Sequence, residues 1–156
     1  MRDSVLIIVC GLPGAGKTTM SLSLEAERNG IRLSPDDWME ALDVSLWDES
    51  MRGRIERLQW ELGQDLLRAG NVVIIEWGTW GRAERERLRT EARLLGAQVE
   101  LIFLDPPLDE LYRRIQARGQ EDPPIPRADL DRWDRIFERP DPSEQDDYDS
   151  AVVITD

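Results

Sequence analysis

The stretch Gly11-Leu12-Pro13-Gly14-Ala15-Gly16-Lys17-Thr18 decides the fold of this chain. It fits the pattern G-x-x-x-x-G-K-[ST], whose glycines let backbone N–H groups curl around phosphates, while the lysine reaches the phosphates and the hydroxyl reaches Mg²⁺. The β-branched apolar run from Ser4 to Val9 is typical of a parallel strand covered on both faces, and residues 19–28 are compatible with a helix. Strand, loop and helix in this order predict a phosphate-binding loop for ATP and Mg²⁺, although no base-reading motif separates ATP from GTP.

Alternating strand and helix patterns continue along the rest of the chain. Strands are predicted at 31–34, 72–75, 98–104 and 151–154, and helices after the turn at 35–37 and at 51–69, 82–95, 108–118 and 128–137. Such alternation predicts a parallel α/β sheet with right-handed crossovers. We expect a three-layer P-loop NTPase fold in one domain over residues 1–156, with a five-stranded sheet flanked by helices and a small helical lid at about 112–127.

Composition excludes several kinds of site. The chain has one cysteine, Cys10, and no histidine, so an internal disulfide, a zinc site or a histidine-based triad has no residues to use. The longest apolar run has six residues, whereas a membrane span needs about 20, so we expect a cytoplasmic protein without a membrane anchor. A net charge of −12 disfavours nucleic acid and anionic membranes as partners, although a local basic site stays compatible with it.

The basic residues are nearly all arginine, because Lys17 is the only lysine in the sequence. A compact ammonium fits a phosphate cradle better than a planar guanidinium does, which explains its survival there. Much of the negative charge lies toward the end of the chain. We expect the acidic, proline-containing connection at 139–150 to be flexible and solvated, with protein binding through 141–149 as the alternative.

Acidic residues follow three of the predicted strands. Asp36 and Asp37 come after the second strand, Glu76 after the third and Asp105 after the fourth. Ligands of open parallel sheets bind beyond the carboxyl ends of the strands, where a kinase needs a carboxylate near the acceptor hydroxyl and another near Mg²⁺. The structural alternatives are a helix cap for the Asp pair, a turn acid for Glu76 and a turn or capping residue for Asp105.

Four segments together resemble a known family. They are Gly11 to Thr18, Ser34 to Trp38, Val72 to Glu76 and Tyr112 to Gly119. These segments resemble the small P-loop kinases related to the phage-type polynucleotide 5′-hydroxyl kinase, the chloramphenicol phosphotransferase and the zeta-toxin-type kinases. The resemblance covers nearly the whole chain. It implies that Asp36 is the general base and that Arg114 and Arg118 are lid arginines that reach the ATP phosphates.

The two arginines also make physical sense without the family. Arg114 and Arg118 are four residues apart and therefore share one helix face, and a loop with three prolines follows them. Guanidinium forks stabilise charge on a transferring phosphoryl group. The alternative is a solvated basic face that pairs with nearby acids, which is the interpretation we prefer for Arg113.

The sequence departs from the polynucleotide kinase at Met39, where that enzyme has a phosphate-binding arginine. Acids and indoles surround this position: Asp36, Asp37, Trp38, Glu40, Asp43, Glu76, Trp77 and Trp80. Such a region suits a neutral or cationic small molecule better than a polyanion. The sequence therefore predicts an ATP-dependent kinase that phosphorylates a hydroxyl of a small molecule. The alternatives are a nucleoside or polynucleotide 5′-hydroxyl kinase and a nucleotide-binding regulatory ATPase module.

The predicted site residues fall into four groups. Nucleotide contacts are Gly11, Leu12, Pro13, Gly14, Ala15, Gly16, Lys17, Thr18, Thr19 and Arg118. The catalytic residues are Lys17, Asp36, Arg114 and Arg118, and the Mg²⁺ residues are Thr18 and Glu76. The acceptor residues are Asp36, Asp37, Trp38, Glu76 and Trp77. The identity of the acceptor and the oligomeric state do not follow from the sequence.

Overall fold

A computed structural model describes residues 3–156 of the chain, which form one five-stranded parallel sheet in the order β2-β3-β1-β4-β5. The strands are β1 (Val5–Cys10), β2 (Ile31–Leu33), β3 (Val72–Ile75), β4 (Gln98–Leu104) and β5 (Ser150–Ile154). All six residues of β1 are buried because β3 pairs with one edge, β4 pairs with the other and helices cover both faces. The predicted five-stranded parallel sheet is confirmed.

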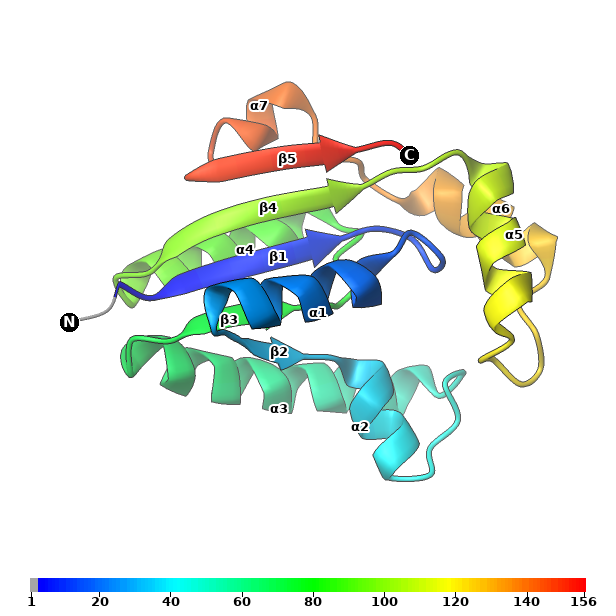
Figure 1. Cartoon of the computed structure of the whole chain (residues 1–156), viewed down its shortest axis with the longest axis horizontal. Helices are drawn as coiled ribbons and strands as arrows, with labels where there is room; N and C mark the ends of the chain where they lie inside the picture. The colour runs from blue at the N-terminus through cyan, green and yellow to red at the C-terminus, as the bar shows by residue number, and fades with distance from the viewer. Residues whose placement is uncertain (1–2) are drawn as a thin grey trace.

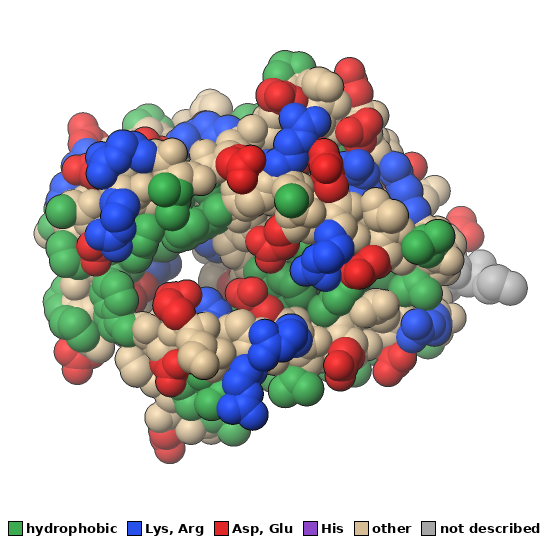
Figure 2. Space-filling model, turned by 180° about the vertical axis from the view of Figure 1, so that it is seen from behind, with side chains coloured by type: hydrophobic (Ala, Val, Ile, Leu, Met, Phe, Trp, Pro, Cys, Tyr) green, Lys and Arg blue, Asp and Glu red, His purple; other side chains and the backbone are tan. Residues whose placement is uncertain are grey.

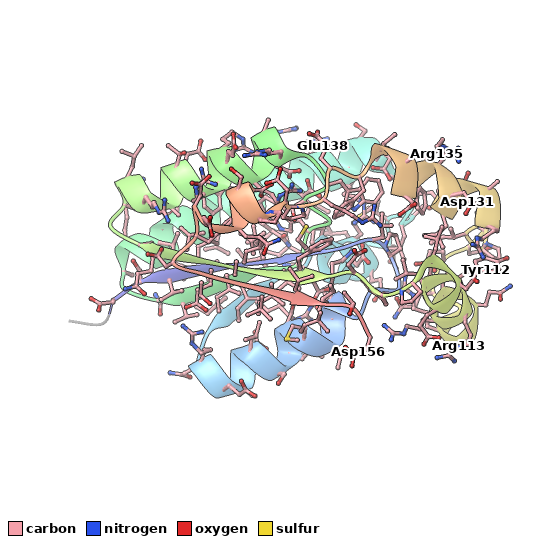
Figure 3. The ribbon with its side chains drawn as sticks, turned by 90° about the horizontal axis from the view of Figure 1, so that it is seen from above. Tyr112, Arg113, Asp131, Arg135, Glu138 and Asp156 are labelled. Carbon is pink, nitrogen blue, oxygen red and sulfur yellow. The ribbon has the colours of Figure 1, made fainter. Side chains whose placement is uncertain are left out.

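Seven helices surround this sheet in the described part of the chain. They are α1 (Lys17–Arg28), α2 (Pro35–Ala41), α3 (Glu49–Arg68), α4 (Arg82–Leu94), α5 (Leu108–Arg118), α6 (Arg127–Ile136) and α7 (Pro142–Gln145). Helix α1 lies on one face of the sheet and α3, α4 and α7 lie on the other (Figures 1 and 3). Helices α5 and α6 stand beyond the carboxyl ends of the strands (Figure 1). None of the helices within residues 3–156 is long and apolar enough to cross a bilayer.

Local sequence explains where the helices around the future site begin. The hydroxyl of Ser34 accepts a hydrogen bond from the backbone N–H of Asp37 and so caps α2. The carboxylate of Asp48 accepts from the N–H of Met51 at 3.0 Å and caps α3. Helix α3 then buries Ile55, Gln59, Trp60, Gly63 and Leu67 at helical spacing against the sheet. These caps fix the residues at which α2 and α3 begin.

The acidic connection at 139–150 exposes most of its acids, as we expected, but a short helix and one buried acid tie it to the core. It contains α7, where the carboxylate of Asp141 accepts from the N–H of Glu144 at 2.8 Å. The side chain of Glu144 is fully buried and accepts hydrogen bonds from Nε and an Nη of Arg85 at 2.7 and 2.8 Å. The Tyr148 hydroxyl also donates to Glu144, at 3.0 Å. A buried arginine on α4 therefore holds this segment against the core.

Candidate active site

The phosphate-binding loop joins β1 to α1 at the carboxyl edge of the sheet. Gly14 and Gly16 have φ values of 84° and 99°, which side chains rarely adopt. A Cβ on Gly14 would also lie 2.7 Å from the carbonyl oxygen of Leu111 on α5. The loop therefore needs glycine twice, for its curl and for its close approach to α5. Residues 13–19 line a large cavity, whereas the buried Gly11 and Leu12 support the loop from beneath.

Lys17 is the first residue of α1, and its side chain folds back along the loop. Its Nζ donates a hydrogen bond to the carbonyl oxygen of Gly11 at 2.8 Å, and Nε1 of Trp80 donates to the same oxygen at 3.3 Å. Burial lowers the pKa of Lys17 to about 8, against the opposing charges of Asp36 and Glu76. The only lysine of the chain therefore lies buried at a helix N-terminus, near two acids. The phosphates of a nucleotide would balance its positive charge there.

Thr18 and Glu76 meet beside this lysine, as the sequence predicts for a pair that serves one metal. The Thr18 hydroxyl donates to Oε2 of Glu76 at 2.8 Å, while Oε1 of Glu76 accepts from Arg32 at 3.0 Å. Within residues 3–156 no group of three or more acidic, cysteine or histidine side chains gathers as a complete metal site. Mg²⁺ commonly uses one or two protein oxygens together with phosphate oxygens and water, so Thr18 and Glu76 fit this ion.

A cavity of about 730 Å³ opens from the phosphate loop toward α3, α4 and the loop after α5. Figure 2 shows the surface hollowed next to the end of the molecule where α5 and α6 lie. Asp36, at the start of α2, lines this cavity, and its Oδ1 accepts from Arg52 of α3 at 2.7 Å. The arrangement places the carboxylate of Asp36 in the same cavity as the phosphate loop.

Three of the predicted acceptor residues do not line the cavity. Asp37 is exposed and pairs with Arg32, and Trp38 lies outside the cavity wall. Trp77 is buried against α3, where its Nε1 donates a hydrogen bond to the side chain of Gln59 at 3.0 Å. Trp80, three residues later, does reach the cavity. We therefore keep Asp36 and Glu76 from the predicted acceptor set and leave out Asp37, Trp38 and Trp77.

The surroundings of Met39 also differ from our expectation. Met39 lies on α2, and its side chain is fully buried and does not line the cavity. Sequence reasoning placed no cation in the acceptor region, yet Arg52 of α3 reaches Asp36 and also donates to the carbonyl oxygen of Leu46 at 3.0 Å. Arg52 was missed because it lies sixteen residues along the chain from its partner.

The two predicted lid arginines lie on the opposite wall. Arg114 of α5 donates to Glu110 at 3.0 Å, and one Nη lies 3.4 Å from the carbonyl oxygens of Gly14 and Ala15. Arg118 donates to Glu121 at 2.7 Å. Both arginines line the cavity together with the phosphate loop. Both also form ion pairs with nearby acids, as expected for a solvated basic face.

Further cavity residues escaped sequence reasoning: Trp47, Glu49, Glu56, Glu84, Gln120, Glu121, Ile125 and Trp133. One signal was present on α3, because Arg52 and Glu56 fall on the helix stripe that continues into the buried Gln59 and Gly63. Charged residues on a core-facing stripe indicate a site rather than a solvated surface. Burial raises the pKa of Glu56 to about 7, and the charge of Glu84 adds to this effect.

Parallel strands in the order 2-3-1-4-5, a glycine loop opening α1 and a paired threonine and acid define a P-loop kinase fold. The sequence model of a family described as an AAA domain matches residues 6–140, so the chain belongs to this AAA domain family. The narrower resemblance to the polynucleotide kinase, chloramphenicol phosphotransferase and zeta-toxin group stays a prediction.

Individual proteins are also similar to this chain. A guanylate kinase of Salinibacter ruber is 29% identical in an alignment over 184 residues that covers all of this chain and 90% of that protein. A protein assigned as a kinase, from Chloroflexus aurantiacus, superposes with a TM-score of 0.77 at 22% identity, covering 99% of this chain and 89% of that one.

Two further solved structures share the fold at 18% identity. Kti12 of Chaetomium thermophilum, solved with ADP-AlF3, gives a TM-score of 0.72 and covers 96% of this chain and 88% of its own. A gluconokinase of Sinorhizobium meliloti gives 0.66 and covers 99% and 84%.

Proposed function

We propose that this protein is a kinase that transfers the γ-phosphoryl group of ATP to a hydroxyl group of a small molecule. One continuous cavity of about 730 Å³ carries this proposal, because the phosphate loop, Asp36 and residues of α3 and α4 all line it. A nucleotide switch that only hydrolyses ATP needs room for a water beside the γ-phosphate, whereas a kinase needs room for an acceptor. The likeness to a gluconokinase supports a hydroxyl acceptor, whereas the likeness to a guanylate kinase supports phosphoryl transfer in general.

Each residue has a role that follows from its position. Lys17 and the N–H groups of the loop hold the β and γ phosphates. Thr18 and Glu76 would hold Mg²⁺, which would reduce the negative charge of the phosphates. Asp36 accepts the proton of the acceptor hydroxyl as its oxygen forms a bond to the γ-phosphorus and the bond to the bridging oxygen of ADP breaks. Arg114 and Arg118 neutralise the charge that develops on the transferring group and on ADP.

Two competing functions make different predictions. A polynucleotide kinase needs cations along the path of a phosphodiester chain, and in the described part of the acceptor region Arg52 is the cation that faces Asp36. A regulatory ATPase module would bind nucleotide without an acceptor. The likeness to Kti12 makes this second alternative worth testing directly.

The test is a panel assay with γ-labelled ATP and Mg²⁺ against hydroxylated small molecules, nucleosides, GMP and oligonucleotides with free 5′-hydroxyl groups. We expect label to appear on small hydroxyl compounds and to vanish with the Lys17→Ala variant, which controls for contaminating kinases. Labelling of oligonucleotide 5′ ends alone would support the polynucleotide kinase. Release of labelled phosphate without transfer to any acceptor would support the regulatory module.

A further inference from the structure

Two carboxylates on facing helices line the acceptor end of the cavity without a basic partner. Glu56 of α3 and Glu84 of α4 are both half-buried, and both belong to the cavity wall. Neither carboxylate lies within 4.0 Å of a basic group among the described residues, although the chain has many arginines and most of these form ion pairs. Half-buried acids without partners are costly, so they need an explanation other than folding.

The charges around this pair do not cancel. Arg52, one turn before Glu56, is engaged with Asp36 and the carbonyl oxygen of Leu46. Burial raises the pKa of both Glu56 and Glu84, and the negative charge of Glu84 raises the pKa of Glu56 further. The charges of Arg52 on Glu56, and of Arg87 and Arg85 on Glu84, oppose these shifts without reversing them. Glu49, which also lines the cavity, adds another negative charge on the same face of α3. The acceptor end of the cavity is therefore electronegative.

Three indole rings line the same cavity. The rings of Trp47 and Trp133 lie 6.2 Å apart, and those of Trp133 and Trp80 lie 5.8 Å apart, in tilted contact. All three tryptophans line the cavity. Nε1 of Trp47 donates to the carbonyl oxygen of Pro123 at 2.7 Å, so the indole is held across from the loop that follows α5. The faces of indole rings attract cations, and their area favours an organic group over a hydrated metal ion.

We infer that the acceptor is an amine-bearing hydroxyl compound whose ammonium group binds between Glu56 and Glu84, against the indole wall. This inference rests on the proposed kinase activity, because it names the class of compound that enters the acceptor end of the same cavity. The ammonium supplies a positive charge in direct contact with both carboxylates, which form no ion pair within 4.0 Å among the described residues. Asp36 and the phosphate loop keep the roles described above, and the ammonium takes no part in bond making.

Binding of matched probes tests this inference separately from phosphoryl transfer. The protein is saturated with Mg²⁺ and a non-hydrolysable ATP analogue at pH 8, and calorimetry measures the affinity of two pairs of compounds. The pairs are trans-4-aminocyclohexanol with its N-acetyl derivative, and kanamycin A with its fully N-acetylated form. We expect the amines to bind about tenfold more tightly or better than their uncharged counterparts.

Variants assign this preference to the two carboxylates. Glu56→Gln and Glu84→Gln each keep the size of the side chain and should remove most of the preference for the amine. Glu61→Gln is the matched control, because Glu61 is exposed on the same helix and lies outside the cavity. Equal affinity for charged and uncharged probes, no binding of either amine, or a preference that survives in both variants would overturn the inference.

The proposed function has its own readout in the same experiment. Failure to bind the ATP analogue, or ATP hydrolysis without transfer in the acceptor panel, contradicts the kinase. Normal nucleotide binding with transfer to neutral hydroxyl compounds alone would support the kinase activity and contradict the inference that the acceptor carries an amine.

Discussion

Helix α4 carries two neighbouring charged residues whose surroundings are opposite. Arg85 is fully buried, and Glu144, Thr79 and Glu138 together accept hydrogen bonds from its Nε and both of its terminal nitrogens. Glu84, one residue earlier, faces the cavity and Glu56 without a basic partner. The fold thus neutralises charge where it closes the interior and leaves charge uncompensated at the acceptor end of the cavity. The difference indicates which charges serve stability and which await a ligand.

The energetics support this division. A guanidinium buried without a partner costs several kcal/mol, so the interior accommodates Arg85 only because Glu144 and two backbone carbonyls match it. A cavity wall has another option, because Glu56 can take up a proton near neutral pH when no cation is present. Charge changes at the two places should therefore affect different properties of the protein.

The largest expected effect is on phosphoryl transfer. Asp36→Asn keeps the size of the side chain but removes the proposed base, so the transfer rate should fall by about 10²–10⁴-fold. Nucleotide affinity and the free energy of unfolding should change little, because Asp36 is half-exposed at the cavity. Single-turnover kinetics with labelled ATP measures the rate.

Asp37→Asn is the matched control for this prediction. Asp37 is exposed, pairs with Arg32 and does not line the cavity, so transfer should stay close to the wild-type rate. If Asp37→Asn is the damaging change and Asp36→Asn is not, the base is assigned to the wrong residue.

The next largest effect concerns the buried ion pair. Glu144→Gln leaves the Arg85 guanidinium with a neutral partner and should lower the free energy of unfolding by about 3–5 kcal/mol. Urea denaturation measures the change. Glu86→Gln, on the exposed Arg82–Glu86 pair of the same helix, should lower the free energy of unfolding far less, because solvent screens that pair. Equal effects of the two variants would contradict the distinction between buried and exposed charges.

Sequence reasoning found the features that depend on neighbours along the chain. The phosphate loop is local, since Gly14 and Gly16 need positive φ and Lys17 follows them directly. The strands were found because β1 and β3 are apolar on both faces and alternate with helices. Thr18 was assigned to Mg²⁺ from the loop motif and Glu76 from its place at the carboxyl end of a strand, and the two side chains lie in hydrogen-bond contact.

The features that were missed depend on residues far apart in the sequence. Arg85 lies in a helix rich in Arg and Glu, and nothing local distinguishes it from its exposed neighbours or marks Glu144 as its partner 59 residues later. Trp77 and Trp80 look alike in sequence, yet one packs in the core and the other lines the cavity. Such choices are made by packing between elements, which a single sequence does not display.

A third prediction concerns Lys17, whose ammonium group donates a hydrogen bond to the backbone carbonyl oxygen of Gly11. Lys17→Ala should weaken binding of Mg²⁺ and ATP by about 100-fold, because charge-assisted hydrogen bonds to the phosphates are lost. Lys17→Arg should fail to restore the affinity if the compact shape of the ammonium matters. Calorimetry with ATP measures both variants. Unchanged affinity in both would remove the basis for the phosphate-loop assignment.

The smallest effect concerns Glu56, which faces Glu84 of α4, Arg52 and Glu49 of α3 and Asp36 of α2. Its pKa in the folded protein, about 7, exceeds the ordinary 4.5, so the folded state retains a proton that the unfolded chain releases between these pH values. Stability therefore falls as the pH rises through this window. Glu56→Gln lacks this loss and should be more stable than the wild type at pH 8 by on the order of 1–3 kcal/mol.

Urea denaturation at several pH values checks this prediction. The advantage of Glu56→Gln should shrink as the pH falls from about 7 and should disappear below about pH 4, where Glu56 is protonated in both states. Glu61→Gln, at an exposed position of the same helix, should show no such dependence. A variant that is less stable than the wild type at pH 8 would mean that Glu56 has a stabilising partner.

The pairing of Arg85 with Glu144 also has a consequence for protein synthesis. The ribosome completes the phosphate loop, Asp36 and α3 long before it reaches residue 144, and until then a nascent chain carries Arg85 without its partner. An early, compact intermediate would have to bury that guanidinium unmatched or keep α4 away from the sheet. The phosphate loop, Asp36 and α3 are thus made first, but their final packing against α4 waits until Glu144 has left the ribosome.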